Sequence, residues 1–177
     1  MKVSTRVFIF VAAFVALSVV VAYASTLTLP PGEASSISSQ TQSLPSTTKG
    51  IFLNNVQIAL TEFIPVYGPV FGILVSYDTG VATAALSQAN PQAHLSGLEL
   101  FLFLILTPIY WLEFFSYSLA VEESIAVVIW IALSVKNRSL DKTELKWLVG
   151  SILAVVIVLF FSARLESSLV GGLIPNS

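Results

Sequence analysis

Cysteine is missing from this 177-residue chain, and histidine occurs only once, as His94. The absence of cysteine excludes disulfides, thiolate metal sites and cysteine nucleophiles. One histidine cannot form a histidine-based metal cluster within a single chain, and the polar residues around it predict a solvated loop. We therefore expect the protein to bind no metal and no cofactor.

Charged residues are also scarce. They form 10% of the chain, compared with about 25% in average globular proteins, and the net charge of −2 comes without the concentrated basic face that nucleic-acid binding needs. Hydrophobic residues form 55% of the chain, the mean hydropathy is +0.88, and the apolar residues fall in continuous blocks. The sequence therefore predicts an all-α, polytopic bundle of about five spans in the cell membrane, with no nucleic-acid partner.

The N-terminal segment, residues 1–24, has the parts of a secretory signal. Lys2 and Arg6 precede an apolar run over residues 7–21, and small residues stand at cleavage-site spacing before Ser25. Two interpretations stay open, because a cleaved signal peptide and an uncleaved signal anchor share this pattern. In both, the basic residues stay in the cytoplasm and the chain from Ser25 onward lies outside.

Residues 25–50 are rich in serine, threonine, proline and glutamine, which is typical of an extended, solvated linker. We expect this linker to be extracytoplasmic, either as a plain spacer or as a carrier of O-linked sugars. Residues 51–166 follow as the helical membrane domain. The uncharged C-terminal tail, residues 167–177, is predicted to lie along the outer membrane interface.

Prolines divide the first half of the membrane domain. Pro65 and Pro69 each remove an amide donor and clash with the preceding turn. Residues 51–64 and 69–86 are therefore predicted to form separate helices, and a polar stretch at residues 77–80 is predicted to interrupt the second one.

The next apolar run, residues 98–135, would reach about 57 Å as one helix, far more than a hydrocarbon core of about 30 Å needs. Pro108 is the natural break, because proline is tolerated in the first turn of a helix. Residues 98–107 are thus predicted to be re-entrant or to form part of a kinked span.

The most basic loop, residues 136–146, is predicted to lie in the cytoplasm. The Asn137-Arg138-Ser139 sequon within it would then be a chance match, because N-glycosylation occurs on the other side. The predicted crossings are the N-terminal segment, residues 51–66, residues 69–86, one net crossing through residues 98–135, and residues 147–163.

A helix that begins at Pro108 carries an acidic face. Its members recur at intervals of three and four residues: Glu113, Ser116, Tyr117, Ala120, Glu123 and Ser124. Glu122 lies almost opposite Glu113. Each uncompensated charge in hydrocarbon would cost at least about 2.5 kcal/mol, and no lysine or arginine lies in the core of any predicted span to neutralise these acids.

Three states of the acids stay open. They are structural if they are protonated and hydrogen-bonded, with the available partners being Asn54, Ser116 and Tyr117. A second possibility is a proton or cation route through Glu62, Asp78, Glu113 and Glu123. The third is solvation at the membrane interface, which applies to Glu122 and Glu123 and, at helix ends, to Glu62 and Asp78.

Three short motifs follow one another within residues 51–135: Asn54-Asn55, then Asp78-Thr79-Gly80, then Leu106-Thr107-Pro108 with Glu113 five residues after the proline. This series resembles the stage II sporulation protein M family, including its archaeal members. The family has an asparagine in its first conserved helix, an Asn-Gly pair in the next, and a Pro-His-Gly-x-x-Glu motif that leads into a bent helix. Pro108 and Glu113 match that motif by spacing, whereas Ile109 and Tyr110 replace its histidine and glycine.

The resemblance implies a multispan helical membrane protein without catalysis of its own. Bacterial members are linked to septal wall remodelling during spore engulfment, as partners of secreted wall hydrolases. The serine- and threonine-rich outer segment and the small cytoplasmic mass look more archaeal than spore-forming.

Two functions are consistent with these observations. We favour a non-enzymatic scaffold or assembly subunit of a membrane complex, whose partners are the lipid bilayer and other membrane subunits in a homo- or hetero-oligomer. The chain is small and lacks an obvious pair of inverted repeats, which favours this class over transporters. The alternative is a proton- or cation-coupled transporter or channel subunit that uses its intramembrane carboxylates. The candidate functional residues are Glu113, Pro108, Glu123, Glu62, Asp78, Asn54 and Tyr117.

Overall fold

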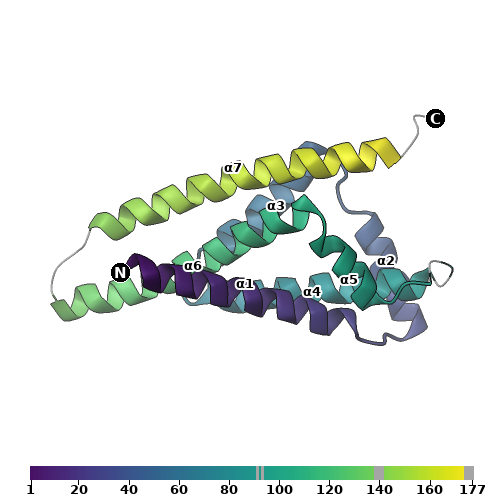
Figure 1. Cartoon of the computed structure of the whole chain (residues 1–177), viewed down its shortest axis with the longest axis horizontal. Coiled ribbons are helices and arrows are strands. Elements are labelled where there is room, and N and C mark those ends of the chain that lie inside the picture. The colour runs from purple at the N-terminus through teal and green to yellow at the C-terminus, as the bar shows by residue number, and fades with distance from the viewer. Residues whose placement is uncertain (91, 93, 138–141, 174–177) are drawn as a thin grey trace.

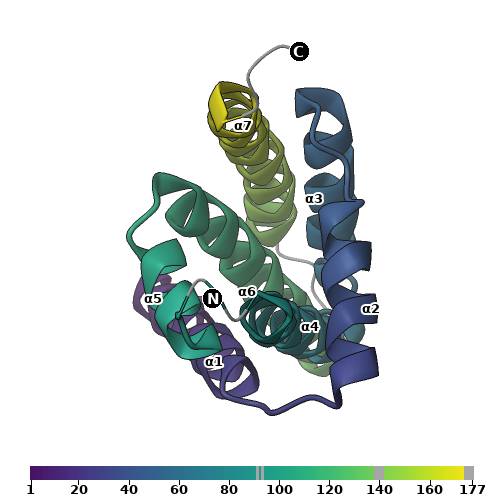
Figure 2. The same cartoon turned by 90° about the vertical axis from the view of Figure 1, so that its right-hand side faces the viewer.

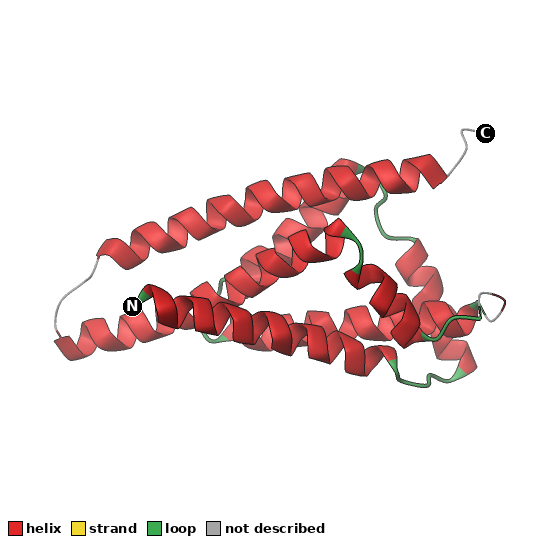
Figure 3. Ribbon diagram, viewed as in Figure 1, coloured by secondary structure: helices red, strands yellow, loops and turns green. Residues whose placement is uncertain are grey.

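The computed structural model describes residues 1–90, 92, 94–137 and 142–173. These residues form helices joined by short loops, without strands, which confirms the predicted all-α fold (Figure 3). In chain order the helices are α1 (Val3–Ser25), α2 (Pro31–Gln42), α3 (Thr48–Glu62), α4 (Tyr67–Ala89), α5 (Gly97–Ile105), α6 (Pro108–Asn137) and α7 (Lys142–Leu173).

Four of these helices, α1, α4, α6 and α7, are long and apolar enough to cross a membrane. The chain is therefore a multi-pass membrane protein. Helix α3 has 15 residues and α5 has 9, fewer than the roughly 20 that a hydrocarbon core requires. The described residues thus contain four helices of spanning length, close to the predicted number of about five, and the helix before Pro65 is shorter than a span.

Helix α6 lies between α1 and α7 and packs against both (Figures 1 and 2). Helices α1 and α4 also lie side by side, and Gly80 permits their close approach. A Cβ atom at this position would come within 2.5 Å of the Val21 carbonyl oxygen and of the Ala24 Cβ. The interior is filled by apolar side chains of several helices, among them Leu17, Ala59, Phe101, Phe114 and Leu159.

The break between α3 and α4 confirms the prediction from the two prolines. In the turn, the Gly68 N–H donates to the Ile64 carbonyl at 2.8 Å, and Ser124 Oγ of α6 donates to the same carbonyl at 2.8 Å. Val66 has a φ of 69°, a conformation that β-branched residues rarely adopt. The strained turn is therefore held against the middle of α6, and α3 and α4 form a hairpin around it.

The break at Pro108 is also confirmed. Helix α5 ends at Ile105 and α6 begins at Pro108. Thr107 Oγ1 accepts a hydrogen bond from the Tyr110 N–H at 3.3 Å, and Trp111 Nε1 donates to the Ile105 carbonyl at 2.8 Å. Residues 98–107 are thus a short helical arm that bends into α6.

The loop before α5 contains His94, which is exposed as predicted. Helix α5 then starts with a capping box, in which Ser96 Oγ accepts from the Glu99 N–H while the Glu99 carboxylate accepts from the Ser96 N–H. The Ser96 N–H and the Ser96 hydroxyl both donate to the exposed Glu99 carboxylate, and these two hydrogen bonds lower the pKa of that carboxyl.

The predicted extended linker over residues 25–50 is wrong in its middle part. Residues 31–42 form helix α2, which packs against α4. Pro31 is compatible with this helix because it lies in the first turn, where its missing amide donor is not needed. Ala34 and Ser38 are buried, so tertiary packing outweighs the low helical preference of the serine-rich segment.

Two other predicted boundaries also differ. Helix α4 continues through residues 77–80 without interruption, because a single glycine costs only about 1 kcal/mol in a helix. Helix α7 exceeds the predicted span of residues 147–163 at both ends and takes up most of the predicted tail, residues 167–177. Residues 174–177 and, within the sequon, Arg138 and Ser139 lie outside the described residues.

Candidate functional site

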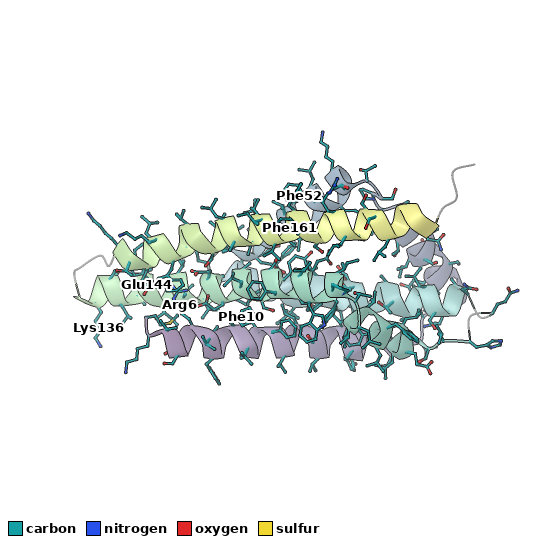
Figure 4. The ribbon with its side chains drawn as sticks, turned by 45° about the horizontal axis from the view of Figure 1, so that its top comes forward. Arg6, Phe10, Phe52, Lys136, Glu144 and Phe161 are labelled. Carbon is teal, nitrogen blue, oxygen red and sulfur yellow. The ribbon has the colours of Figure 1, made fainter. Side chains whose placement is uncertain are left out.

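Arg6 of α1 binds three glutamates of α6 and α7 (Figure 4). Its Nη1 donates to Glu122 Oε1 at 3.0 Å and to Glu123 Oε1 at 2.8 Å. Its Nη2 donates to Glu144 Oε2 at 2.5 Å. Ser151 Oγ donates a further hydrogen bond to Glu123 Oε1 at 2.7 Å. These five residues, called here the Arg6 cluster, connect α1, α6 and α7.

The charges of the Arg6 cluster are removed from solvent. Arg6 is 6% exposed, Glu122 is 2% exposed and Glu123 is 1% exposed. The Trp147 ring lies 5.3 Å from the guanidinium carbon of Arg6, which is a cation–π distance. Burial of these charges is tolerated because the guanidinium and the carboxylates replace each other's lost hydration.

The prediction that no basic residue neutralises these acids is wrong. Helix α1 begins at Val3, earlier than the apolar run suggests, so that Arg6 lies within the helix and faces α6. Because Glu122 and Glu123 are buried, their proposed solvation at an interface is also wrong. Arg6 and Glu122 are 116 residues apart, and no local pattern signals their pairing.

A second polar group joins α3, α6 and α7. Asn55 Nδ2 donates to Glu113 Oε1 at 2.6 Å, and Ser162 Oγ donates to the same oxygen at 3.3 Å. Tyr117 lies one turn further along α6 and is within electrostatic range of both Glu113 and Glu62. These five residues are called here the Glu113 cluster. Within the described part of the chain, no lysine or arginine forms an ion pair with its acids.

Glu62 is the most enclosed acid of the Glu113 cluster. Its side chain is 1% exposed, and its Oε2 has no hydrogen-bond partner among the described residues. The carboxyl group lies over Gly72 of α4, where a Cβ atom would be 3.3 Å from Glu62 Oε1. An ionised Glu62 would lose its hydration without compensation, at a cost of several kcal/mol, so the arrangement favours the neutral acid.

The inward face predicted for α6 is confirmed. Glu113 is half-buried, and the remaining members of that face are buried: Ser116, Tyr117, Ala120, Glu123 and Ser124. Ser116 Oγ donates to the Leu112 carbonyl of its own helix at 2.8 Å and not to one of the acids. Glu122 on the opposite side is buried as well, because Arg6 of α1 covers that side.

The other candidates are separated by the fold. Asp78 is exposed on α4 and joins neither cluster. Asn54 is exposed and donates only to Asn55 Oδ1, at 3.2 Å, so Asn55 takes the hydrogen-bonding role predicted for Asn54. Pro108 begins α6 and sets the position of Glu113, which follows it by about one and a half turns. The four acids of the predicted proton or cation route are thus separated. Glu62 and Glu113 belong to the Glu113 cluster and Glu123 belongs to the Arg6 cluster, whereas Asp78 belongs to neither.

The helices and their buried polar contacts define the chain as an all-α, multi-pass membrane protein. Among the described residues, no group of three or more histidines, cysteines, aspartates or glutamates is placed so that it could hold a metal ion. No protein-family model, no curated protein and no solved structure matches the chain.

Proposed function

We propose that this protein is a non-enzymatic scaffold or assembly subunit of a membrane complex, of the kind represented by the stage II sporulation protein M family. The observation that carries the proposal is how the interior charges are bonded. Arg6 binds three glutamates from two other helices, and Glu113 accepts hydrogen bonds from α3 and α7. These acids are engaged in contacts between helices, which suits a structural role.

Such contacts fix geometry more than they add net stability. A buried ion pair gains little over well-packed apolar residues, but removal of one partner is strongly destabilising. Rotation of α1 by one residue would turn Arg6 by about 100° and break its three ion pairs. The Arg6 cluster therefore favours a single arrangement of α1, α6 and α7, and a rigid outer surface is what an assembly subunit must present to its partners.

The contact between Asn55 and Glu113 supports the family assignment within this proposal. The two residues are 58 positions apart, and each belongs to a motif on which the resemblance rests. Their side chains meet at 2.6 Å, next to the bend that Pro108 introduces. Two separate motifs of the family pattern thus meet at one place in the bundle.

The proposal includes an orientation, with the N-terminus and residues 136–146 in the cytoplasm and residues 25–50 outside. It is supported by the position of Arg6, Lys136 and Glu144 at one end of the bundle (Figure 4), since basic residues collect on the cytoplasmic side. We also propose that residues 1–24 are retained as an anchor. Their removal would leave Glu122 and Glu123 buried without Arg6.

Partner capture from the native membrane tests the scaffold proposal. The tagged chain is crosslinked in intact membranes, solubilised and purified, and the attached proteins are identified by mass spectrometry. We expect the same membrane partners with the wild type and with Glu113→Gln, because a neutral amide still accepts the hydrogen bond from Asn55. An unrelated multi-pass protein from the same membrane is the control. Recovery of the chain alone, or only with proteins that the control also captures, would contradict the proposal.

A proton- or cation-coupled transporter subunit is the second candidate. It is favoured by the buried carboxyl group of Glu62, whose Oε2 has no hydrogen-bond partner among the described residues. The test uses purified protein in liposomes that contain a pH-sensitive dye, under an imposed gradient of protons or of a monovalent cation. Flux in the wild type that is lost in Glu62→Gln and Glu113→Gln but kept in Glu99→Gln, at an exposed site on α5, would establish this function. Flux no greater than that of empty liposomes would rule it out.

A further inference from the structure

Helices α1 and α7 flank α6 and leave a groove between them. In the described residues the backbones of α1 and α7 do not pack on each other, although both pack on α6. Three adjoining hollows of about 380, 210 and 420 Å³ follow one another over α6 and are together called here the α1/α7 groove. The first is lined by α1 and α6, the second by all three helices, and the third by α6 and α7. Phe10 and Phe115 line the first and the second, and Leu119, Trp147 and Ser151 line the second and the third.

The chemistry of the groove changes along its length. The end near Trp111 is lined by aromatic and aliphatic side chains alone. The middle lies over the Arg6 cluster, whose charged groups are buried and paired with one another. The far end contains the exposed Lys146 beside Trp147 and Gly150. The groove is thus an apolar channel, and among the described residues that line it only Lys146 is an accessible cation.

The length of the groove matches one leaflet of a bilayer. Its floor on α6 runs from Trp111 to Glu123, a distance of about 18 Å at the helical rise. A hydrocarbon core measures about 30 Å, so the floor covers little more than half of it. A partner helix that crosses the membrane would need a longer groove, whereas one acyl chain fits this length.

The charge at the end of the groove selects the headgroup. Lys146 is exposed and has no ion-pair partner within the described part of the chain. Lys2, Lys136 and Lys142 are also exposed. Lys136 lies at this end of the bundle (Figure 4), where the N-terminus and the start of α7 also lie (Figure 1). Basic residues next to an apolar groove between membrane helices suit an anionic lipid.

We infer that the α1/α7 groove binds one acyl chain of an anionic phospholipid, with the lipid phosphate at Lys146. The acyl chain covers the side of the Arg6 cluster that would otherwise face mobile hydrocarbon, and Trp147 contacts it at the level of the headgroup. This inference is independent of the proposed scaffold function.

Quenching of tryptophan fluorescence by brominated lipids tests the inference. The full chain, with Trp111 and Trp130 replaced by phenylalanine, is reconstituted in phosphatidylcholine with increasing fractions of brominated phosphatidylglycerol or brominated phosphatidylcholine. We expect Trp147 to report a preference for phosphatidylglycerol on the order of five-fold, as one lysine near the surface provides. A second protein that retains only Trp130, which does not line the groove, should show no preference.

Two variants locate the site. Gly150→Leu adds an apolar side chain at a position that lines the groove and where a Cβ atom meets nothing within 4 Å, and it should abolish the preference at Trp147. Gly32→Leu is the matched control, because a Cβ atom there also meets nothing within 4 Å and the residue lies in α2. Lys146→Gln should remove the preference as well, whereas Lys49→Gln, in α3, should keep it.

Each alternative result overturns the inference. Equal quenching of Trp147 by both lipids would mean that only the bulk bilayer contacts the groove. A preference that survives Gly150→Leu would place the lipid elsewhere. Protection of Trp147 from both lipids would mean that a protein, either a second copy or another subunit, covers the groove.

Discussion

The Arg6 cluster holds three carboxylates around one guanidinium, whereas the Glu113 cluster holds its carboxylates without a cation among the described residues. Both lie between helices of the same apolar bundle, and both use α6 and α7. In the first, charge on both sides is required, because each ion compensates the burial of the others. In the Glu113 cluster, amide and hydroxyl groups supply the hydrogen bonds to the acids, and burial without a cation favours the neutral form of the carboxyl group. The two clusters should therefore respond differently to the same change in charge.

Replacement of Arg6 should have the largest effect on stability of all the changes considered. Arg6→Leu leaves Glu122 without its ion-pair partner, and it leaves Glu123 and Glu144 with only Ser151 and the N-terminal amine of Met1, respectively. The change should lower the free energy of unfolding by about 3–5 kcal/mol. Denaturant unfolding in detergent micelles measures this loss, with Lys2→Leu at an exposed position as the control. Additional neutralisation of the three glutamates by Glu→Gln changes should restore most of the stability. A single Arg6→Leu variant as stable as the wild type would contradict the assignment of the cluster.

The same isosteric change in the two clusters should have unequal effects. Glu123→Gln removes a charged partner of Arg6 and should cost about 1.5–3 kcal/mol, which is the range for hydrogen bonds to charged groups. Glu113→Gln keeps a carbonyl oxygen that accepts from Asn55, and it should cost less than about 1 kcal/mol. Unfolding measured side by side under identical micelle conditions gives the difference. Equal losses would show that charge does not distinguish the clusters.

Asn55 and Asn54 form a matched pair that tests the Glu113 cluster alone. Asn55→Ala removes the amide that donates to Glu113 and should cost about 1–2 kcal/mol. Asn54→Ala changes an exposed side chain and should stay within about 0.5 kcal/mol of the wild type. Both values follow from thermal or denaturant unfolding. An effect of Asn54→Ala as large as that of Asn55→Ala would reverse the roles that the structure gives them.

Glu62→Gln should have the smallest effect. Because Glu62 has no cationic partner among the described residues, the amide replaces the neutral acid at nearly constant shape, and stability should change by less than about 0.5 kcal/mol. The matched change in the Arg6 cluster is Glu122→Gln, which should be clearly more costly. A loss at position 62 as large as that at position 122 would indicate that Glu62 is ionised and bound to a cation.

Breaks in the helices are predictable from the sequence because prolines act locally. Pro65 and Pro108 each kink or break a helix through their own ring and missing amide donor, and the structure breaks near both. Helix α2 is not predictable in this way, since its serine-rich sequence has little helical preference of its own. Its formation depends on packing against α4, which buries Ala34 and Ser38, and this contact appears only in the folded chain.

The polar clusters, too, are predictable only where they depend on local sequence. The inward face of α6 follows from spacing, because residues three or four apart share one side of a helix. The choice of Asn55 over Asn54 requires the rotation of α3 about its axis, since consecutive residues point about 100° apart. The pairing of Arg6 with Glu122 requires the knowledge that α1 packs on α6, which no single segment contains.

The separation of 116 residues between Arg6 and Glu122 also determines the order in which the cluster can form during synthesis. At a synthesis rate of about 5–20 residues per second, Arg6 is added to the chain roughly 6 to 23 s before Glu122. During that interval the first helix enters the membrane with its guanidinium unpaired, and it depends on water, lipid phosphate or the insertion machinery for compensation. Closure of the bundle is therefore a late event, which begins only when α6 arrives and is completed when α7 supplies Glu144.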